Sequence, residues 1–152
     1  MTDLPRLQNY ARRLATVLLV MQTAIEQIVE ENREWLEERN RAYMAEQGET
    51  VAGKTIQPAG YSKGYKTFKQ RYGRFKNTAY VDLKLMGDFH QSIHLDYEGN
   101  LTWNMKSNDV KALALQKKYG KLLGIREEDA KEFIQDILLP QLKLRVVQHL
   151  TV

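Results

Sequence analysis

The chain has 152 residues, no cysteine and a formal net charge of +4 at pH 7. A chain of this length typically forms one domain and buries roughly two thirds of its unfolded surface, so it can fold stably without disulfides. The lack of cysteine excludes disulfides and thiolate metal sites. The longest apolar run, residues 14–21, is far shorter than the roughly 20 residues of a membrane helix, and no signal-peptide pattern opens the sequence. We therefore expect a soluble protein with no membrane partner.

The first predicted element is one long helix over residues 1–47, because no glycine or proline follows Pro5 until Gly48. Asp3 is its expected N-cap. Such a helix would extend for about 60 Å, more than the width of a domain this size, so it either breaks or reaches beyond its own subunit. Apolar residues recur along its first part in steps of three and four, which is typical of a helix that packs lengthwise. This seam consists of Leu7, Ala11, Leu14, Leu18, Met21, Ile25 and Ile28.

The distal part of this helix, residues 30–49, is highly charged but contains Trp35 and Tyr43. Large aromatic residues in a charged segment are unusual without a partner, so both are candidates for contact with a neighbouring chain. The alternative is a solvated helix end whose core contacts are confined to its first half.

Residues 48–80 are predicted to form a long basic, aromatic loop, with a helical turn or two near residues 62–71. No Asp or Glu occurs in residues 50–80. The segment 54–76 combines positive charge with aromatic rings, as phosphate contact and base stacking require, so nucleic-acid binding is one hypothesis. Alternatively, the rings pack on the core and the cations are solvated or face acidic residues of another subunit. The candidate interface cations are Lys63, Lys66, Lys69, Arg71, Arg74 and Lys76.

Two patterns resemble catalytic or metal sites but lack the context that such sites require. Residues 48–55 match the phosphate-loop pattern G-x-x-x-x-G-K-[ST], with Lys54 as the lysine. A strand should precede that pattern and a helix should begin at its lysine, whereas a charged helix precedes it and Pro58 follows. His90 and His94 are four residues apart, but a predicted change from helix to strand separates them. We therefore predict no enzyme, no catalytic residue, no cofactor and no metal site.

Residues 81–152 are predicted to contain a short helix, a β-hairpin and C-terminal helices. Apolar spacing predicts the short helix over residues 85–93, where Gly87 indicates either close approach to a neighbour or a turn. The period then falls to two, which predicts a hairpin with its turn at residues 98–100. Pro140 should kink or split the last helix. The fold class is α+β, a single domain of a long N-terminal helix and C-terminal helices packed on a small antiparallel sheet. The apolar face of the hairpin comprises Ile93, Leu95, Tyr97, Leu101, Trp103 and Met105.

Three motifs follow one another between residues 61 and 129. A central motif Leu-x-x-Thr-Gly-x-Leu-x-x-Ser-Ile is matched at Leu83, Gly87, Ser92 and Ile93. Upstream, a motif Leu-Ser-x-x-Thr-x-x-x-Lys is similar to Tyr61, Ser62, Tyr65 and Lys69. Downstream, Gln-x-x-Gly and Phe-Leu-Gly-Leu-Ser-x-x-Asp are similar to Gln116, Gly120 and residues 123–129. In the order of these motifs, and over roughly residues 15–140, the chain resembles the tail-completion or virion-morphogenesis proteins of tailed bacteriophages, which join head and tail.

This resemblance implies a structural virion component at the head-to-tail neck, synthesised in the host cytoplasm. It also implies a cyclic homo-oligomer in contact with neighbouring connector and tail proteins. A head-to-tail interface between identical subunits closes only by cyclic repetition, which suits the long helical seam. In such a ring the basic loop could face either the acidic residues 30–49 of a neighbour or DNA in the lumen. The alternative function is a nucleic-acid-binding module that uses residues 54–76.

Overall fold

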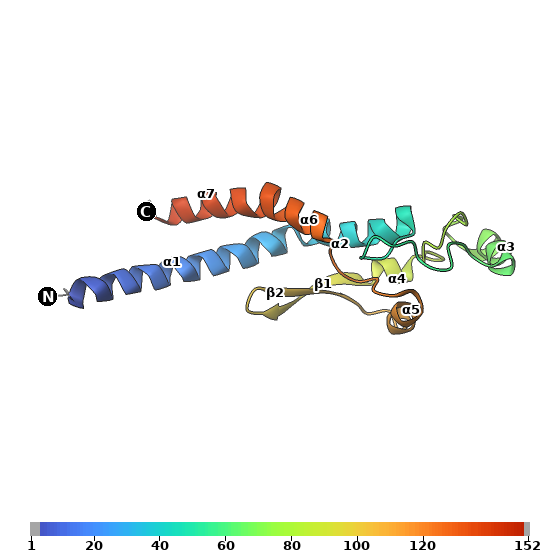
Figure 1. Cartoon of the computed structure of the whole chain (residues 1–152), viewed down its shortest axis with the longest axis horizontal. Coiled ribbons are helices and arrows are strands. Elements are labelled where there is room, and N and C mark those ends of the chain that lie inside the picture. Colours follow the sequence, from blue (N-terminus) through green and yellow to red (C-terminus); the bar gives the residue numbers. More distant parts are fainter. Residues whose placement is uncertain (1–3, 151–152) are drawn as a thin grey trace. The chain divides into compact units, whose positions relative to one another are not determined.

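The structure is a computed structural model that describes residues 4–150 (Figure 1). It is mostly helical with one two-stranded antiparallel sheet, which confirms the predicted α+β class. The chain divides into two compact units, one made of the residues up to Asn32 together with those from Lys131 onward, the other of Arg33–Ala130. Within the described part of the chain, no helix is long and apolar enough to cross a membrane.

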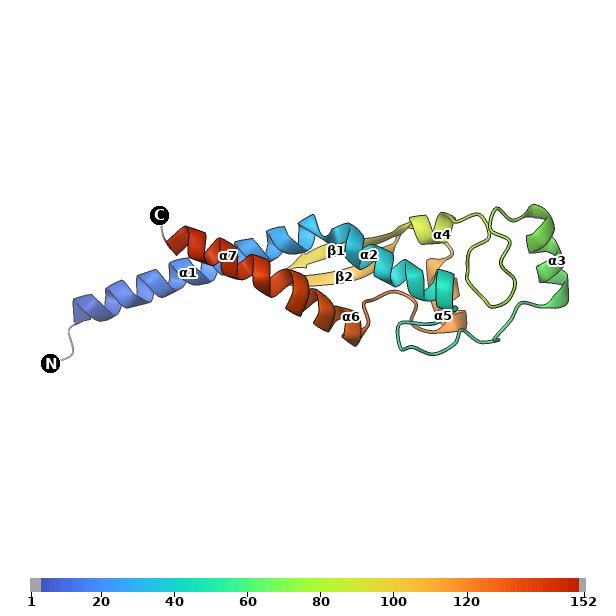
Figure 2. The ribbon, with the colours of Figure 1, turned by 90° about the horizontal axis from the view of Figure 1, so that it is seen from above.

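The first unit is built on a helix pair. Helix α1 (Leu4–Glu31) lies beside helix α7 (Leu139–Leu150) and also contacts the π-helical segment η2 (Phe133–Leu138) (Figures 1 and 2). The long N-terminal helix is thus confirmed, although its predicted cap Asp3 lies outside the described residues. The core of this unit consists of Ala24, Ile28 and Leu142, with Met21, Ile25, Ile137, Leu138 and Val146 packed around them.

The predicted helix over residues 1–47 breaks at Asn32, between α1 and α2 (Arg33–Ala42). The Asn32 side-chain amide donates to the carbonyl oxygen of Ile28 at 2.8 Å, and its backbone N–H is shared between the carbonyls of Ile28 and Val29. An asparagine side chain that satisfies a backbone group in this way competes with continuation of the helix. Of the two alternatives for a helix this long, the break is the one observed.

The C-terminal helical run changes its winding just before Pro140. Helix α6 (Glu127–Glu132) leads into η2, and Pro140 is the second residue of α7. Proline has no backbone N–H to donate to the preceding turn, so a wider π turn before it accommodates the missing bond. The predicted disturbance at Pro140 therefore takes the form of a π-helical segment.

The second unit contains the sheet. Its strands are β1 (Ile93–Gly99) and β2 (Thr102–Ser107), and helix α2 packs against β1. The other elements that lie wholly within the unit are η1 (Tyr43–Gln47), α3 (Lys63–Tyr72), α4 (Asp88–Gln91) and α5 (Ala112–Tyr119).

The predicted hairpin is confirmed, with its turn moved by one or two residues. Leu95 pairs with Met105, and Tyr97 pairs with Trp103. The turn falls at residues 100–101, where both residues adopt positive φ. Leu95 and Met105 are buried, whereas Tyr97 is exposed. Only the half of the apolar face nearest to α4 therefore belongs to the core.

The short helix before the hairpin is smaller than the spacing predicts. Helix α4 has four residues and begins after Gly87, whose φ of 101° ends any helical path from Leu85. A Cβ at Gly87 would lie 2.9 Å from a ring carbon of Phe75. Gly87 therefore serves both roles that its sequence position indicates, a turn and a close approach.

Candidate functional site

Helix α3 carries most of the basic, aromatic segment and lies at one end of the second unit in both ribbon views (Figures 1 and 2). Its start is fixed by Ser62, whose side chain accepts from the backbone N–H of Tyr65 at 3.3 Å. The helix ends at Gly73, and the Lys76 ammonium donates to the carbonyl oxygen of Gln70 at 2.7 Å. A cation at this position satisfies a free helix carbonyl and interacts favourably with the helix dipole.

Four aromatic rings form a continuous row along one side of α3. The centroid of Tyr61 lies 4.8 Å from that of Tyr65, and the row continues from Tyr65 to Phe68 at 6.1 Å and from Phe68 to Tyr72 at 5.1 Å. Burial changes along the row. Tyr61 and Tyr65 are half-buried, whereas Phe68 is 46% exposed and Tyr72 58% exposed. The row therefore leads from the interior to an apolar aromatic surface at the C-terminal end of the helix.

The side of α3 that faces the interior buries Lys69, which forms an ion pair with Asp82. Asp82 also accepts from the Tyr61 hydroxyl at 2.8 Å and from the backbone N–H of Lys84 at 3.0 Å. The Lys69 ammonium lies 4.8 Å from the centroid of the Tyr61 ring. Burial, followed by the hydrogen bond to Asp82, raises the pKa of Tyr61, so this hydroxyl stays protonated as a donor. These contacts satisfy the buried charge with groups of the same chain.

Lys69 is thus the first correction to the predicted interface. It is fully buried, so it belongs to the fold and not to a surface. The other five cations of the set remain accessible on or after α3: Lys66 is half-buried, while Lys63, Arg71, Arg74 and Lys76 are exposed.

Tyr43 is the second correction, because its side chain is buried within the second unit. Its hydroxyl donates to the carboxylate of Asp129, and the Arg126 guanidinium carbon lies 3.9 Å from the centroid of its ring. Arg126 in turn donates to Glu49 at 2.8 Å and to the carbonyl oxygen of Thr50 at 2.9 Å. Burial is the main reason why the pKa of Tyr43 is raised. Tyr43 therefore links η1 to the start of α6 and is not a contact with another chain. Trp35, by contrast, is half-buried, with the Arg39 guanidinium carbon 4.7 Å from its ring centroid, and it stays a candidate.

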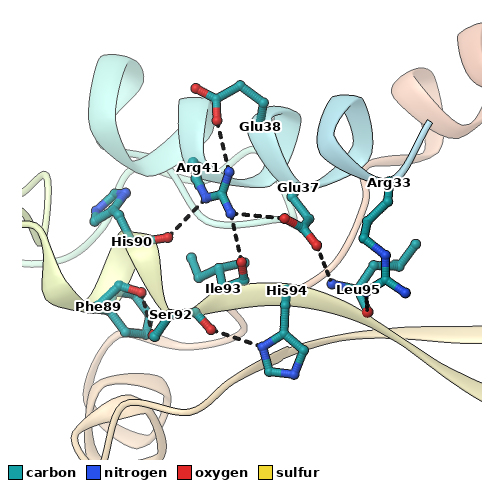
Figure 3. Close-up of polar contacts among 10 residues, drawn as sticks. All are labelled: Arg33, Glu37, Glu38, Arg41, Phe89, His90, Ser92, Ile93, His94 and Leu95. Atoms are coloured by element: carbon teal, nitrogen blue, oxygen red, sulfur yellow. Dashed lines mark hydrogen bonds and ion pairs between the residues drawn. The ribbon is translucent and has the colours of Figure 1, made fainter. Parts of the chain in front are cut away.

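Sequence reasoning missed the polar contacts that attach α2 to β1 (Figure 3). Arg41 donates to the carbonyl oxygens of His90 and Ile93 at 2.9 and 2.8 Å, and it is paired with Glu37 at 3.0 Å. Glu37 also accepts from the backbone N–H of Leu95 at 2.9 Å. The available signal was the spacing of four between Glu37 and Arg41, which places them on one helix face. Because a two-stranded sheet has two open edges, these side chains also satisfy β1 backbone groups that have no strand partner.

The apolar seam of α1 is covered along only part of its length. Ile28 is buried, and Met21 and Ile25 are half-buried against the core of the first unit. Toward the N-terminus, Leu14 is 61% exposed and Leu18 is 58% exposed. Single exposed leucines are ordinary, but a contiguous apolar stripe typically marks an interaction site. We call this the open seam; it consists of Leu4, Leu7, Ala11, Leu14 and Leu18, flanked by Tyr10 and Leu19.

The phosphate-loop pattern folds into a tight turn that differs from a phosphate-binding loop. Gly48 ends η1 with a φ of 64°, and a Cβ there would lie 2.6 Å from the Tyr80 ring. Glu49 and Thr55 form an isolated antiparallel bridge, and Lys54 is exposed within that turn. The next helix, α3, begins only at Lys63, so no helix N-terminus is placed behind Lys54.

The two central histidines lie on different elements. His90 belongs to α4 and is buried, with Nε2 2.8 Å from the carbonyl oxygen of Asp82. His94 belongs to β1, with Nδ1 3.0 Å from the carbonyl oxygen of Ser92. Among residues 4–150 no group of three potential metal ligands is found.

A cavity of about 380 Å³ is lined by the loop before α3, by residues 81–89 and by α5. Its lining is mostly apolar and aromatic, and it carries both signs of charge, Asp88 and Asp109 with Lys111 and Lys118. This balance favours neither an anion nor a cation, in contrast to the outer surface of α3.

Comparisons with protein-family models, with curated proteins and with solved structures found no match. The arguments for function therefore depend on the geometry of this chain. Several residues of the three sequence motifs hold structural positions in it: Ser62 caps α3, Lys69 forms the buried ion pair, Gly87 precedes α4, and Ser92 ends α4.

Proposed function

We propose that this protein is a structural component of the head-to-tail junction of a tailed bacteriophage virion and that it acts by assembling into a ring of identical subunits. In the ring it contacts neighbouring connector and tail proteins, and it works as a building block without catalysis or cofactor. The motif order described above supports the virion context. The observation that carries the assembly is the open seam of α1.

The open seam continues the same three-and-four spacing as the covered part of α1. In the covered part, Met21, Ile25 and Ile28 pack against α7 and η2. A second helix laid along Leu7, Leu14 and Leu18 would bury side chains that are more than half exposed. Burial of apolar surface contributes about 25 cal/mol per Å², so burying a seam of this length between two subunits would stabilise their association substantially.

The distribution of charge along α1 favours a second copy of this chain as the partner. Residues 4–25 contain Arg6, Arg12 and Arg13 and no acidic residue, whereas Glu26, Glu30 and Glu31 follow in the last part of the helix. Two copies that are staggered along their helix axes place the basic half of one helix near the acidic part of the other. Complementary charge of this kind sets register and orientation in helix pairing.

The test is self-association of a variant in which Leu14→Glu and Leu18→Glu introduce charge into the open seam. We expect the wild-type protein to form a concentration-dependent oligomer in sedimentation velocity and closed rings in electron micrographs. The double variant should remain monomeric with unchanged helical circular dichroism, because both side chains are exposed in the single chain.

The matched control places the same two charges on the opposite side of α1, with Asn9→Glu and Thr16→Glu. Both positions are exposed, and neither belongs to the seam. The control should assemble like the wild type. A wild-type protein that stays monomeric at high concentration, or a seam variant that assembles as well as the control, would contradict the proposal.

A further inference from the structure

The C-terminal end of α3 combines two exposed aromatic rings with three exposed cations. Phe68 and Tyr72 carry the rings, and Arg71, Arg74 and Lys76 carry the charges. We propose that this surface, which we call the α3 platform, binds single-stranded nucleic acid by base stacking and phosphate contact. This goes beyond the proposed function and does not depend on ring assembly.

The rings are placed where a base could reach them. Phe68 and Tyr72 lie one helical turn apart, with centroids separated by 5.1 Å and planes tilted by 43°. Both are more exposed than Tyr61 and Tyr65, the inner members of the same row. Exposed apolar side chains that lie together often mark an interaction site, and unpaired bases stack on aromatic rings whatever their sequence.

One of the three cations lies beside a ring of the platform, and another lies beside the half-buried Phe75. The guanidinium carbon of Arg71 is 5.2 Å from the centroid of the Tyr72 ring, and that of Arg74 is 5.6 Å from the centroid of Phe75. The Lys84 ammonium is 4.4 Å from the same Phe75 ring. Cations that flank aromatic rings can contact the phosphates of a strand whose bases stack, as in many surfaces that bind single strands.

The local charge is not cancelled by acidic side chains from the same segment. Residues 50–81 contain no Asp or Glu, and the carboxylate that follows, Asp82, is buried in its pair with Lys69. The burial of Lys69 thus removes one cation and one anion from the surface together and leaves the platform positive.

An acidic segment of another protein would match the cations but would gain little from the exposed rings. A nucleic-acid strand uses both features, because its phosphates pair with the arginines and its bases cover Phe68 and Tyr72. A duplex offers phosphates but keeps its bases stacked on one another. The observations therefore favour a single strand.

The experiment is fluorescence anisotropy of labelled oligothymidylate and of a duplex of equal length, at protein concentrations where the chain is monomeric. We expect tighter binding of the single strand, weakened by at least tenfold between about 50 and about 200 mM salt. Arg71→Gln with Arg74→Gln should weaken binding to both probes about tenfold and lower the salt dependence. Phe68→Ala with Tyr72→Ala should weaken single-strand binding about tenfold and change duplex binding less than twofold.

A matched control removes two exposed charges elsewhere, with Lys117→Gln and Lys143→Gln, and should change affinity less than twofold. Circular dichroism checks that each variant is folded. The inference is overturned if the wild type does not bind the single strand at the lower salt concentration, or if the control loses as much affinity as the arginine variant. It is also overturned if the aromatic variant binds like the wild type, or if the arginine variant affects only self-association, which would identify an acidic surface of another copy as the partner.

Discussion

Helices α1 and α3 both depart from the usual arrangement of apolar side chains inside and charged side chains outside, but only α3 also buries a charged side chain. The first half of α1 leaves Leu14 and Leu18 more than half exposed. Helix α3 instead buries Lys69 completely and turns Phe68 and Tyr72 outward. The buried charge needs a partner to offset its desolvation, whereas a contiguous exposed apolar surface typically marks an interaction site.

The location of that partner is what distinguishes the two helices. Lys69 finds its partner in the same unit, since Asp82 and the Tyr61 ring contact its ammonium group. In α1, the core of the first unit includes Met21, Ile25 and Ile28, whereas Leu14 and Leu18 of the open seam are more than half exposed. A buried charge with all its partners present indicates a structural role, whereas an exposed apolar stripe that continues a packed seam indicates an interface.

The largest expected effect comes from removing the partner of Lys69. Asp82→Asn leaves a buried ammonium facing a neutral amide, and we expect the free energy of unfolding to fall by about 3–5 kcal/mol. Urea denaturation followed by circular dichroism measures this change. If Lys69 were held only loosely, its side chain would move to solvent and the loss would be below about 1 kcal/mol.

A second substitution separates the buried charge from the other contacts of Asp82. In the double variant Lys69→Met with Asp82→Asn, no isolated charge remains, and the amide oxygen can still accept from Tyr61 and from the backbone of Lys84. We expect the double variant to be more stable than Asp82→Asn alone. A double variant as unstable as the single one would show that the loss comes from the hydrogen bonds of Asp82 and not from the unpaired lysine.

The sequence predicted regular elements well and long-range pairing poorly. The presence of α1 and of the hairpin follows from the spacing of apolar residues, which is a local property, whereas the break at Asn32 was not located. The burial of Lys69 depends on Asp82, thirteen positions away along an irregular segment, and the burial of Tyr43 depends on Asp129, 86 positions away. Periodicity contains no information about such partners, so both residues were predicted as surface contacts.

The sequence predicts which segment forms the candidate site, but it does not predict which side chains of that segment are exposed. The acid-free composition of residues 50–80 correctly located a basic, aromatic region, and a short helix near residues 62–71 was anticipated. Which cations face outward depends on the rotation of α3 about its axis, and that rotation is fixed by Ser62 at its start and by Lys69 inside. Among the six cations only Lys69 occupies a position of the upstream motif, but a motif match does not tell whether the side chain is buried.

Substitutions in the covered and the open part of the α1 seam test whether only the covered part contributes to the stability of the monomer. The expected loss of stability is smaller than for Asp82→Asn. Ile28→Ala should lower the free energy of unfolding by about 3 kcal/mol, because the side chain is fully buried against Ala24 and Leu142. Leu14→Ala should change it by no more than about 0.5 kcal/mol in the monomer, because the side chain is already exposed. Urea denaturation at a concentration where the chain is monomeric measures both. Equal losses in the two variants would mean that the open seam is packed within the single chain.

The smallest expected effect is the pH dependence of stability that arises from the buried side chain of His90 in α4. Burial lowers the pKa of His90 from its ordinary value of 6.5, so the folded chain holds this ring neutral while the unfolded chain takes up a proton near that value. Its contribution to stability is therefore present above about pH 6.5 and declines as the pH falls toward 5, by at most about 1.4 kcal/mol per pH unit for one proton. His90→Gln should flatten this part of the stability curve, whereas the exposed control His149→Gln should not. If both variants keep the wild-type slope, the pH dependence originates in other groups and His90 is not held neutral by the fold.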